Sequence, residues 1–380
     1  MSGIYIHIPF CKQACHYCNF HFSTSLRYKN EFLDALLKEI ELVEPPPPPV
    51  ETIYFGGGTP SILETEELEA ILKKLNHRFG WASDAEITLE ANPDDITPQK
   101  LQDWKNLGFN RLSIGVRSFY EEDLRWMNRA HNAQQALQSI QQAVQVFPNI
   151  TVDLIYGSPG LTDEKWQKNM ETAVQLGITH ISCYALTVEP ATPLARLIRK
   201  GEVSDVDNDQ QSRQFLMLVD YLQANGFEHY EISNFAKPGH RSKHNSAYWK
   251  NKYYLGLGPG AHSYDGKNRW WNVANNNIYI RSILEGKLPQ EKEQLTEAQQ
   301  WNEWLMIHLR TMEGIDLEEM RERFSHFAQI STWMQQLETG LSTPIKRGYI
   351  LQEGPRYFLS AAGKLLADGI AADLFVDEPL

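Results

Sequence analysis

Near its start the chain reads Tyr5-Ile-His-Ile-Pro-Phe-Cys11-Lys-Gln-Ala-Cys15-His-Tyr-Cys18-Asn-Phe20, and this stretch contains three of the four cysteines among 380 residues. The three cysteines are separated by three and then two residues. On a loop, that spacing lets three thiolates converge on one centre, whereas a helix or strand would point some of them away. A [4Fe-4S] cluster takes one thiolate per iron, so three cysteines leave one iron free to bind a small molecule. The spacing therefore predicts a cluster held by Cys11, Cys15 and Cys18.

Two alternatives to a cluster remain open at this stage. A zinc site would need a fourth ligand, and the nearby candidates are His7, His16 and His21. A disulfide between two of the cysteines would leave the third cysteine unpaired. The tight three-then-two spacing fits neither common zinc pattern, which favours the cluster.

Composition limits the class of protein. An apolar share of 42% across 380 residues is enough for a sizeable core and suits one large domain with a smaller one. The formal net charge of -12, without any Lys- or Arg-rich run, argues against a nucleic-acid partner. No charged leader, signal core or spanning segment precedes the apolar residues 4–8, and the few cysteines fit a reducing compartment. We therefore expect a cytoplasmic protein.

Short apolar strands alternate with helical patterns along the first half of the chain. Strands are expected at 4–8, 52–55, 86–90, 111–116, 151–155 and 180–186, and helices at 28–43, 64–79, 98–107, 121–146 and 163–176. Six strands alternating with helices predict a parallel α/β sheet whose crossover helices cover its faces. The alternation alone does not separate a partial barrel from a doubly wound sheet.

Chemically suggestive residues follow the ends of these strands. The cysteines come after the first strand, Gly56-Gly-Gly-Thr59 after the second, and Glu90 ends the third. Arg117 follows the fourth strand and Asp153 lies within the fifth. Ligands of parallel α/β sheets gather at the carboxyl ends of the strands. The coincidence predicts one active centre at that edge.

The cysteine stretch, with Tyr17 before the third cysteine, resembles the radical S-adenosylmethionine (SAM) superfamily. Within it, Tyr5 to Phe20 resembles the branch that contains oxygen-independent coproporphyrinogen III oxidase and the haem chaperone HemW. The resemblance implies a partial (β/α)6 TIM-like barrel. It also implies that SAM chelates the free iron, where reduction of the cluster can cleave the sulfonium to a 5′-deoxyadenosyl radical.

The resemblance assigns further residues to SAM. It implies that the glycine loop holds the methionyl amino group and that charged side chains bind the ribose and the methionyl carboxylate. The alternatives are a tight turn for the glycine run, which its residues alone would favour, and an ordinary ion pair at a strand end for each charged residue. The expected SAM-binding residues are Tyr5, Gly57, Gly58, Thr59, Glu90, Arg117, Arg129 and Asp153.

Two positions depart from the family pattern. Ser113-Ile-Gly-Val-Arg117-Ser-Phe119 has arginine where the family has a glutamine that is expected to bond the ribose. Arginine is longer, charged and has no acceptor, so the SAM geometry at that corner is expected to differ. Leu161 likewise replaces an expected glutamine.

His244-Asn-Ser-Ala-Tyr248-Trp249 resembles the His-Asn-x-x-Tyr-Trp signature of the haem chaperone. Histidine can ligate haem iron, and Tyr248 and Trp249 offer flat faces to a porphyrin. The alternative is that these residues only pack the segment onto the barrel. We expect His244, Tyr248 and Trp249 to form the haem site.

Two sister functions and a plain iron–sulfur carrier compete. The oxidase typically carries another cysteine two places beyond the third, where this chain has Phe20, and an extension before the first strand. Both differences favour the haem chaperone over the oxidase, and an electron carrier would have little use for SAM motifs. The family implies haem delivery to an acceptor protein, such as a respiratory protein at the membrane.

The expected domains are a SAM core barrel at 1–190, an irregular extension with the haem motif at 191–287, and a C-terminal domain at 288–380. Within the extension, 227–235 alternates like a single strand. In the last part, helical patterns precede a hairpin at 349–359 and a final helix at 361–374. This order predicts a small α+β, winged-helix-like appendage.

Overall fold

The computed structural model describes residues 2–377, and its centre is a sheet of twelve strands. Six of them are parallel neighbours in chain order, which confirms the predicted α/β architecture. They are β1 (Ser2–Ile8), β2 (Val50–Gly57), β3 (Glu86–Ala91), β4 (Arg111–Arg117), β5 (Ile150–Tyr156) and β6 (His180–Ala185). Because all six run the same way, their carboxyl ends meet at one edge, as in a partial TIM-like barrel.

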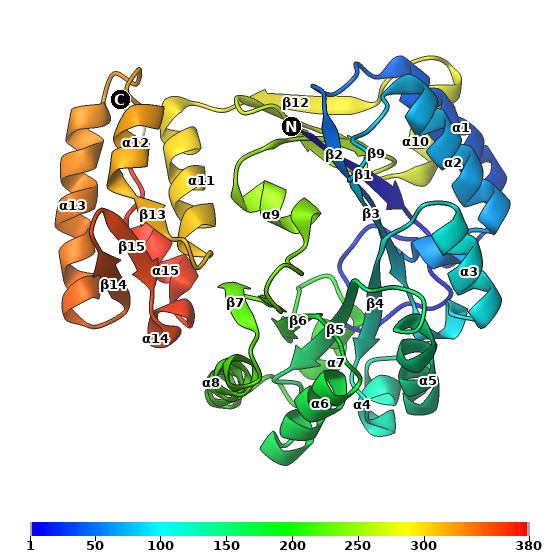
Figure 1. Cartoon of the computed structure of the whole chain (residues 1–380), viewed down its shortest axis with the longest axis horizontal. Helices are drawn as coiled ribbons and strands as arrows, with labels where there is room; N and C mark the ends of the chain where they lie inside the picture. The colour runs from blue at the N-terminus through cyan, green and yellow to red at the C-terminus, as the bar shows by residue number, and fades with distance from the viewer. Residues whose placement is uncertain (1, 378–380) are drawn as a thin grey trace.

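Crossover helices cover the outer, convex side of this curved sheet (Figure 1). Apolar residues on one face of each helix pack on the strands, and Trp104 and Trp166 are fully buried there. The helix α2 begins with a capping box between Glu64 and Glu67. The helices are α1 (Lys29–Leu42), α2 (Thr65–Arg78), α3 (Pro98–Asn106), α4 (Glu121–Trp126), α5 (Ala133–Ala143) and α6 (Asp163–Gln175).

The sheet continues beyond the barrel strands at both edges. Next to β1 lies the parallel β9 (Tyr253–Leu257), followed by the antiparallel β10 (His262–Tyr264), β11 (Asn268–Asn272) and β12 (Gln290–Gln294). Next to β6 lies the antiparallel hairpin of β8 (Asn234–Ala236) and β7 (Glu228–Glu231). Residues 191–287, expected to be irregular, therefore supply most of these added strands. They also form α7 (Pro193–Arg199), α8 (Asn208–Ala224), α9 (Lys243–Trp249) and α10 (Asn276–Leu284).

The prediction of one strand over 227–235 was wrong. The chain reverses between β7 and β8, where the backbone N–H of Ser233 and the Asn234 side-chain amide donate to Glu231 Oε2 at 3.1 and 2.7 Å. A buried carboxylate therefore closes the turn, and an alternating pattern does not reveal such a side-chain cap.

The C-terminal part has its own core, built around Trp301, Trp304, Phe324 and Trp333. Its three-stranded sheet has the order β13-β15-β14, and the expected hairpin at 349–359 is confirmed. The elements are α11 (Glu297–Leu309), β13 (Ile315–Asp316), α12 (Leu317–Arg323), α13 (Ile330–Lys346), β14 (Ile350–Glu353), β15 (Arg356–Leu359), α14 (Ala361–Lys364) and α15 (Ala367–Asp373). Within residues 2–377, no helix has the length and apolar character needed to cross a bilayer.

Backbone pairing joins this domain to the barrel. The N–H of Ile232 donates to the Arg310 carbonyl at 3.1 Å, and the N–H of Met312 donates to the Tyr230 carbonyl at 3.1 Å. Arg310 also pairs with the buried carboxylate of Glu231 at 3.4 Å. In Figure 1, α9 lies on the concave side of the sheet, between the strands and α11. The C-terminal part is thus joined to the barrel by specific hydrogen bonds and an ion pair.

Because several histidines are buried in the neutral form, we expect the free energy of unfolding to decrease in acid. Burial lowers the pKa of His131, His229 and His244 to about 3, from the ordinary 6.5. Between these values the unfolded chain binds protons that the folded chain does not, so stability falls as the pH drops below 6.5, by about 1.4 kcal/mol per pH unit and histidine. Glu39 and Glu90 act in the opposite direction, because burial raises their pKa to about 6 and about 7.

Urea unfolding between pH 7 and 5 checks this sign, and we expect the free energy of unfolding to decrease on acidification. His131→Gln should flatten the slope, whereas His326→Gln, at an exposed position, should leave it unchanged. A protein that becomes more stable on acidification in this range would contradict the prediction.

Candidate functional site

The cysteine loop follows the carboxyl end of β1 and is fixed by its backbone. The Cys11 N–H donates to the Ser23 carbonyl at 3.0 Å, and the Ser23 N–H donates to the Pro9 carbonyl at 2.8 Å. Phe10 is buried edge-to-face against Phe32 in α1, with ring centroids 5.3 Å apart. The three thiols of the loop are free and half-buried, and Cys183 is buried in β6. The loop is therefore held in place independently of its sulfur atoms.

Polar side chains from two other loops, Thr59 after β2 and Arg129 between α4 and α5, reach two of the sulfurs. The Thr59 hydroxyl donates to Cys11 Sγ at 3.5 Å, and Arg129 Nη1 donates to Cys15 Sγ at 3.2 Å. Burial raises the pKa of the Cys11 thiol to about 11 and also raises the pKa of Cys18. Thiolates in such surroundings need a cation, and an iron–sulfur cluster supplies one.

The donor set suits a cluster. Among residues 2–377, no three His, Cys, Asp or Glu side chains converge on a point that one metal ion can occupy. A four-iron cluster instead distributes its ligands over separate irons, and this loop offers one cysteine for each of three.

The glycine loop after β2 touches the cysteine loop through its backbone. The Gly58 N–H donates to the Ile8 carbonyl at 2.9 Å, and a Cβ at Gly58 would lie 2.6 Å from the Phe10 carbonyl oxygen. Gly57 has φ +107°, and its Cβ would lie 2.6 Å from the His7 ring. Only glycine allows so close an approach with this backbone. The predicted SAM loop therefore lies directly beside the predicted cluster loop.

Asn92 connects the two loops to Arg129. Its side-chain amide donates to Thr59 Oγ1 at 3.2 Å, and its Oδ1 accepts from Arg129 Nη2 at 2.8 Å. A chain of hydrogen bonds thus runs from Cys11 through Thr59, Asn92 and Arg129 to Cys15. We did not predict a role for Asn92, although its place just after β3 is the signal that would have indicated one.

Glu90 lies at the end of β3 and faces the glycine loop. Its carboxylate accepts from the Tyr54 hydroxyl at 2.7 Å, and Tyr54 stacks with Tyr5 at 6.2 Å between centroids. A Cβ at Gly56 would lie 3.0 Å from the Tyr5 ring and 3.2 Å from the Glu90 carboxyl carbon. Burial raises the pKa of Glu90 to about 7, and the bond from Tyr54 opposes that shift. Tyr5 and Glu90 therefore lie together beside the glycine loop.

Arg117 and Asp153 form an ion pair across β4 and β5. Arg117 Nη1 lies 3.4 Å from Asp153 Oδ2, and Arg117 adopts φ +73°, a left-handed conformation that is rare for a non-glycine residue. The β4–β5 register is irregular between Ile114 and Arg117, which aims the side chain inward. The arginine at the family's glutamine position thus neutralises a half-buried carboxylate.

Unpaired donors remain in this centre. The buried Nε atoms of Arg117 and Arg129 have no hydrogen-bond partner among the described residues. Buried charged donors without partners are rare in folded proteins and suit an anionic group of a ligand, such as the methionyl carboxylate of SAM. The residues present therefore fit both a three-cysteine cluster and SAM beside it.

A double-mutant cycle tests the Arg117–Asp153 pair. Either Arg117→Gln or Asp153→Asn leaves one polar group without its partner, so each should destabilise the protein by about 1–3 kcal/mol. The double variant should be less unstable than the sum of the two, with a coupling of about 0.5–3 kcal/mol in urea unfolding. Strict additivity would show that the two side chains act independently.

The haem motif lies at the opposite end of the strands. It forms α9, whose first N–H groups, from Lys243 and His244, donate to the two carboxylate oxygens of Glu86 at 3.0 Å each. Glu86 is the first residue of β3, whereas Glu90 near its other end belongs to the SAM group. The structure thus brings the cluster and SAM residues together. The haem motif approaches them from the other end of the strands, and its Asn245 lines a small cavity with Glu90 and Asp153.

The side chain of His244 is buried, and both of its ring nitrogens contact neighbouring hydroxyl groups. Its Nδ1 lies 2.8 Å from Thr52 Oγ1, its Nε2 lies 2.8 Å from the Tyr248 hydroxyl, and the residue is 2% exposed. Its ring stacks on Tyr54 at 5.0 Å, so Tyr54 touches both Glu90 and the haem motif. Both ring nitrogens are engaged, and iron ligation by His244 would break one of these contacts.

Trp249, at the end of α9, differs from His244 because its ring nitrogen has no partner in the described part of the chain. Its indole Nε1 is buried without a partner among the described residues, and the Arg310 guanidinium lies 5.7 Å from its ring centroid. Trp249 lines a cleft of about 710 Å³ between α9 and α11, which we call the α9–α11 cleft. The motif therefore reaches a cavity through its tryptophan.

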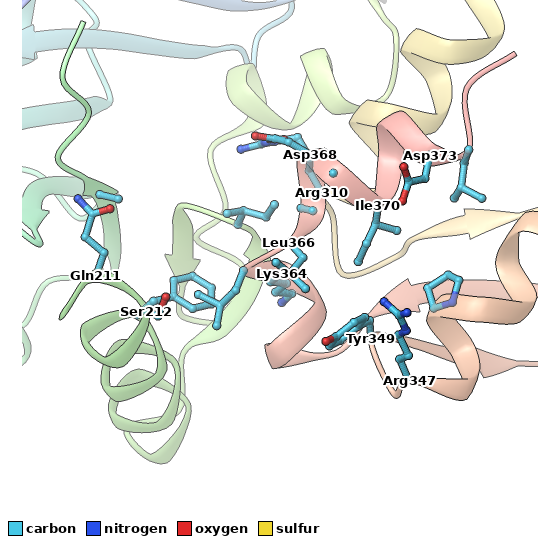
Figure 2. A pocket seen from close by; sticks show the side chains of 18 of the residues that line it. Gln211, Ser212, Arg310, Arg347, Tyr349, Lys364, Leu366, Asp368, Ile370 and Asp373 are labelled. Carbon is cyan, nitrogen blue, oxygen red and sulfur yellow. The ribbon is translucent and has the colours of Figure 1, made fainter. Parts of the chain in front are cut away.

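A second cavity, of about 970 Å³, lies between α8 and the C-terminal helices, and we call it the α8–α15 groove. Figure 2 shows Gln211 and Ser212 on α8 facing Lys364 and Leu366 across it. No histidine, cysteine or methionine lines this groove among the described residues. Its side chains that can act as iron ligands are those of tyrosine, lysine and aspartate.

The partial barrel and its three-cysteine loop define the class of a radical SAM protein, and the model of the radical SAM superfamily matches residues 5–173. Among solved structures, the chain resembles coproporphyrinogen III oxidase (HemN) from Escherichia coli, with a TM-score of 0.85 and 23% identity over 99% of this chain and 90% of that one. At that identity the likeness establishes the fold.

Curated relatives narrow the class. The haem chaperone HemW of Mycobacterium tuberculosis is 34% identical over 98% of this chain and 94% of the relative. HemW of Bacillus subtilis is 34% identical over 97% of this chain and 98% of the relative. The chain belongs to the haem chaperone HemW family. A zebrafish (Danio rerio) relative, the mitochondrial radical S-adenosyl methionine domain-containing protein 1, is 32% identical over 83% of this chain and 74% of its own length.

Proposed function

We propose that this protein binds haem and transfers it to an acceptor protein, and that it carries a SAM-bound [4Fe-4S] cluster. The observation that carries the proposal is the identity of 34% to haem chaperones along nearly the whole of both chains. The match includes the C-terminal domain, which lies outside the radical SAM core. In this proposal the protein acts in the cytoplasm, and its acceptor is a respiratory protein at the membrane.

Cys11, Cys15 and Cys18 would hold the cluster, which supplies one-electron reduction beside a bound sulfonium. Arg129 donates to Cys15 Sγ and Thr59 donates to Cys11 Sγ, so both sulfurs are held in place by neighbouring side chains. In the glycine loop, backbone N–H and C=O groups would meet SAM with no side chain in between. The charged side chains would pair with the charged groups of SAM. The residues assigned to this ligand are Tyr5, Gly57, Gly58, Thr59, Glu90, Arg117, Arg129 and Asp153.

Parallel assays on anaerobically reconstituted protein test the function. Haem titration should give a saturable Soret band at one haem per chain, and the loaded protein should pass its haem to apomyoglobin. Coproporphyrinogen III supplied with SAM and a reductant should remain unchanged. Absence of saturable haem binding, or catalytic conversion of coproporphyrinogen, would overturn the proposal in favour of an oxidase or a carrier.

A further inference from the structure

The α9–α11 cleft has the size and walls of a site for a flat, partly charged ligand. Its volume of about 710 Å³ lies in the range of small-molecule and cofactor sites. Trp249 and Trp304 line it from the barrel side and the C-terminal domain, respectively. Because the two domains each contribute a wall, the cleft exists only when they are in contact.

His308, one helical turn after Trp304 in α11, lines the same cleft. Its ring stacks on Trp304 with 3.8 Å between centroids, and its Nδ1 lies 2.9 Å from the Trp304 carbonyl oxygen. A carbonyl only accepts, so Nδ1 carries the hydrogen and Nε2 keeps its lone pair. Metal-binding histidines are oriented in this way, with the other ring nitrogen donating to a carbonyl or carboxylate.

Two further properties suit His308 to iron. Burial lowers its pKa to about 4, so the imidazole is neutral at pH 7. The structure gives its Nε2 no hydrogen-bond partner among residues 2–377, in contrast to His244, whose two nitrogens are both engaged. Among the described residues that line the cleft, His308 is the one histidine, and no cysteine or methionine joins it.

The charges of the cleft suit a ligand with carboxylates. Arg323 lines it and forms no ion pair among residues 2–377, and its guanidinium lies 5.8 Å from the Phe324 ring. Arg356 is held only loosely by Asp316, at 3.8 Å. Five acidic residues also line the cleft. Glu51 pairs with Lys252, Asp84 with Lys243, Glu313 with Arg241 and Asp316 with Arg356, whereas Glu319 forms no ion pair among residues 2–377.

We propose that haem binds in the α9–α11 cleft, with His308 Nε2 as the axial iron ligand and Arg323 near the propionates; this rests on the proposed haem-binding function. In this arrangement the haem motif works indirectly. His244 anchors α9 to Thr52 and Tyr248, and Trp249 forms one wall of the cleft. His244 is then a positioning residue, while His308 meets the iron.

Haem titration of the full-length protein, read by absorption and electron paramagnetic resonance, tests the ligand. His308→Ala should lose the histidine-ligated spectrum and bind haem at least about tenfold more weakly, and added imidazole should restore the spectrum. His308→Cys should shift the Soret band to that of a thiolate-ligated haem. His326→Ala removes an exposed histidine of the same domain and should match the unmodified protein.

The outcomes distinguish haem binding by the protein from the placement of haem in the α9–α11 cleft. If the unmodified protein binds haem and His308→Ala gives the same spectrum and affinity as His326→Ala, the cleft assignment is wrong and the proposed function stands. If the unmodified protein does not bind haem, both fall. Should His308→Ala fail to fold by circular dichroism, His308→Cys decides: a thiolate spectrum supports the assignment, and an unchanged histidine spectrum overturns it.

Discussion

Cys15→Ser is expected to remove the cluster, with iron and sulfide content falling more than about tenfold after anaerobic reconstitution and the broad visible absorption disappearing. A serine hydroxyl does not replace a thiolate on iron, and the Arg129 guanidinium would lose the sulfur to which it donates. The fold should survive, because backbone bonds hold the loop: the His16 N–H donates to the Met127 carbonyl at 3.1 Å. Metal analysis and circular dichroism measure the two parts.

Cys183→Ser is the matched control. This cysteine lies in β6, buried and on another strand from the loop. Its variant should keep the full iron and sulfide content. Unchanged iron in Cys15→Ser, or zinc without iron and sulfide in the unmodified protein, would contradict the cluster assignment.

The barrel strands could be predicted because their signal is local. In β1, Ile4, Ile6 and Ile8 are buried, and Pro9 ends the run. Each barrel strand is short and has apolar residues at alternate positions, and each is followed by a turn or a helix pattern in the sequence. The position of the site followed from the same signal, since parallel strands bring their carboxyl ends together.

The added strands could not be predicted in this way. The strand β12 reads Gln290-Glu-Lys-Glu-Gln294, contains no apolar residue and is mostly exposed. It is a strand because it pairs with β11 along its whole length. That pairing depends on the tertiary structure and leaves no local signal in the sequence. The β7–β8 reversal likewise depends on one buried side chain, Glu231.

The site shows the same division between local and distant signals. The spacing of the cysteines and glycines is visible in the sequence, whereas Asn92 acts through partners in two other loops. His308 has no motif around it, and only the packing of α11 on the barrel brings it into the same cleft as Trp249. His244 has the motif, yet its burial and two ring contacts are invisible until the strands are assembled. A motif therefore indicates a region, and the contacts decide which side chain can meet a ligand.

Gly58→Ala is expected to abolish most SAM binding. The added Cβ would lie 2.6 Å from the Phe10 carbonyl oxygen and 2.9 Å from the Ile8 carbonyl oxygen. Both are backbone atoms of the segment that leads into Cys11, so no side-chain rotation relieves the contact. The glycine loop must move away from the cysteine loop, which should weaken SAM binding on the order of a hundredfold and destabilise the protein by about 1–3 kcal/mol.

Calorimetric titration of SAM into the reconstituted protein measures the first effect, and urea unfolding measures the second. Gly369→Ala is the control, because its Cβ in α15 meets nothing within 4 Å and alanine is favoured over glycine in a helix. That variant should bind SAM normally and be at least as stable as the unmodified protein. Since the cluster ligands are untouched in both variants, equal iron content assigns any loss in Gly58→Ala to the SAM loop. Normal SAM affinity in a folded Gly58→Ala protein would place the cofactor away from this glycine loop.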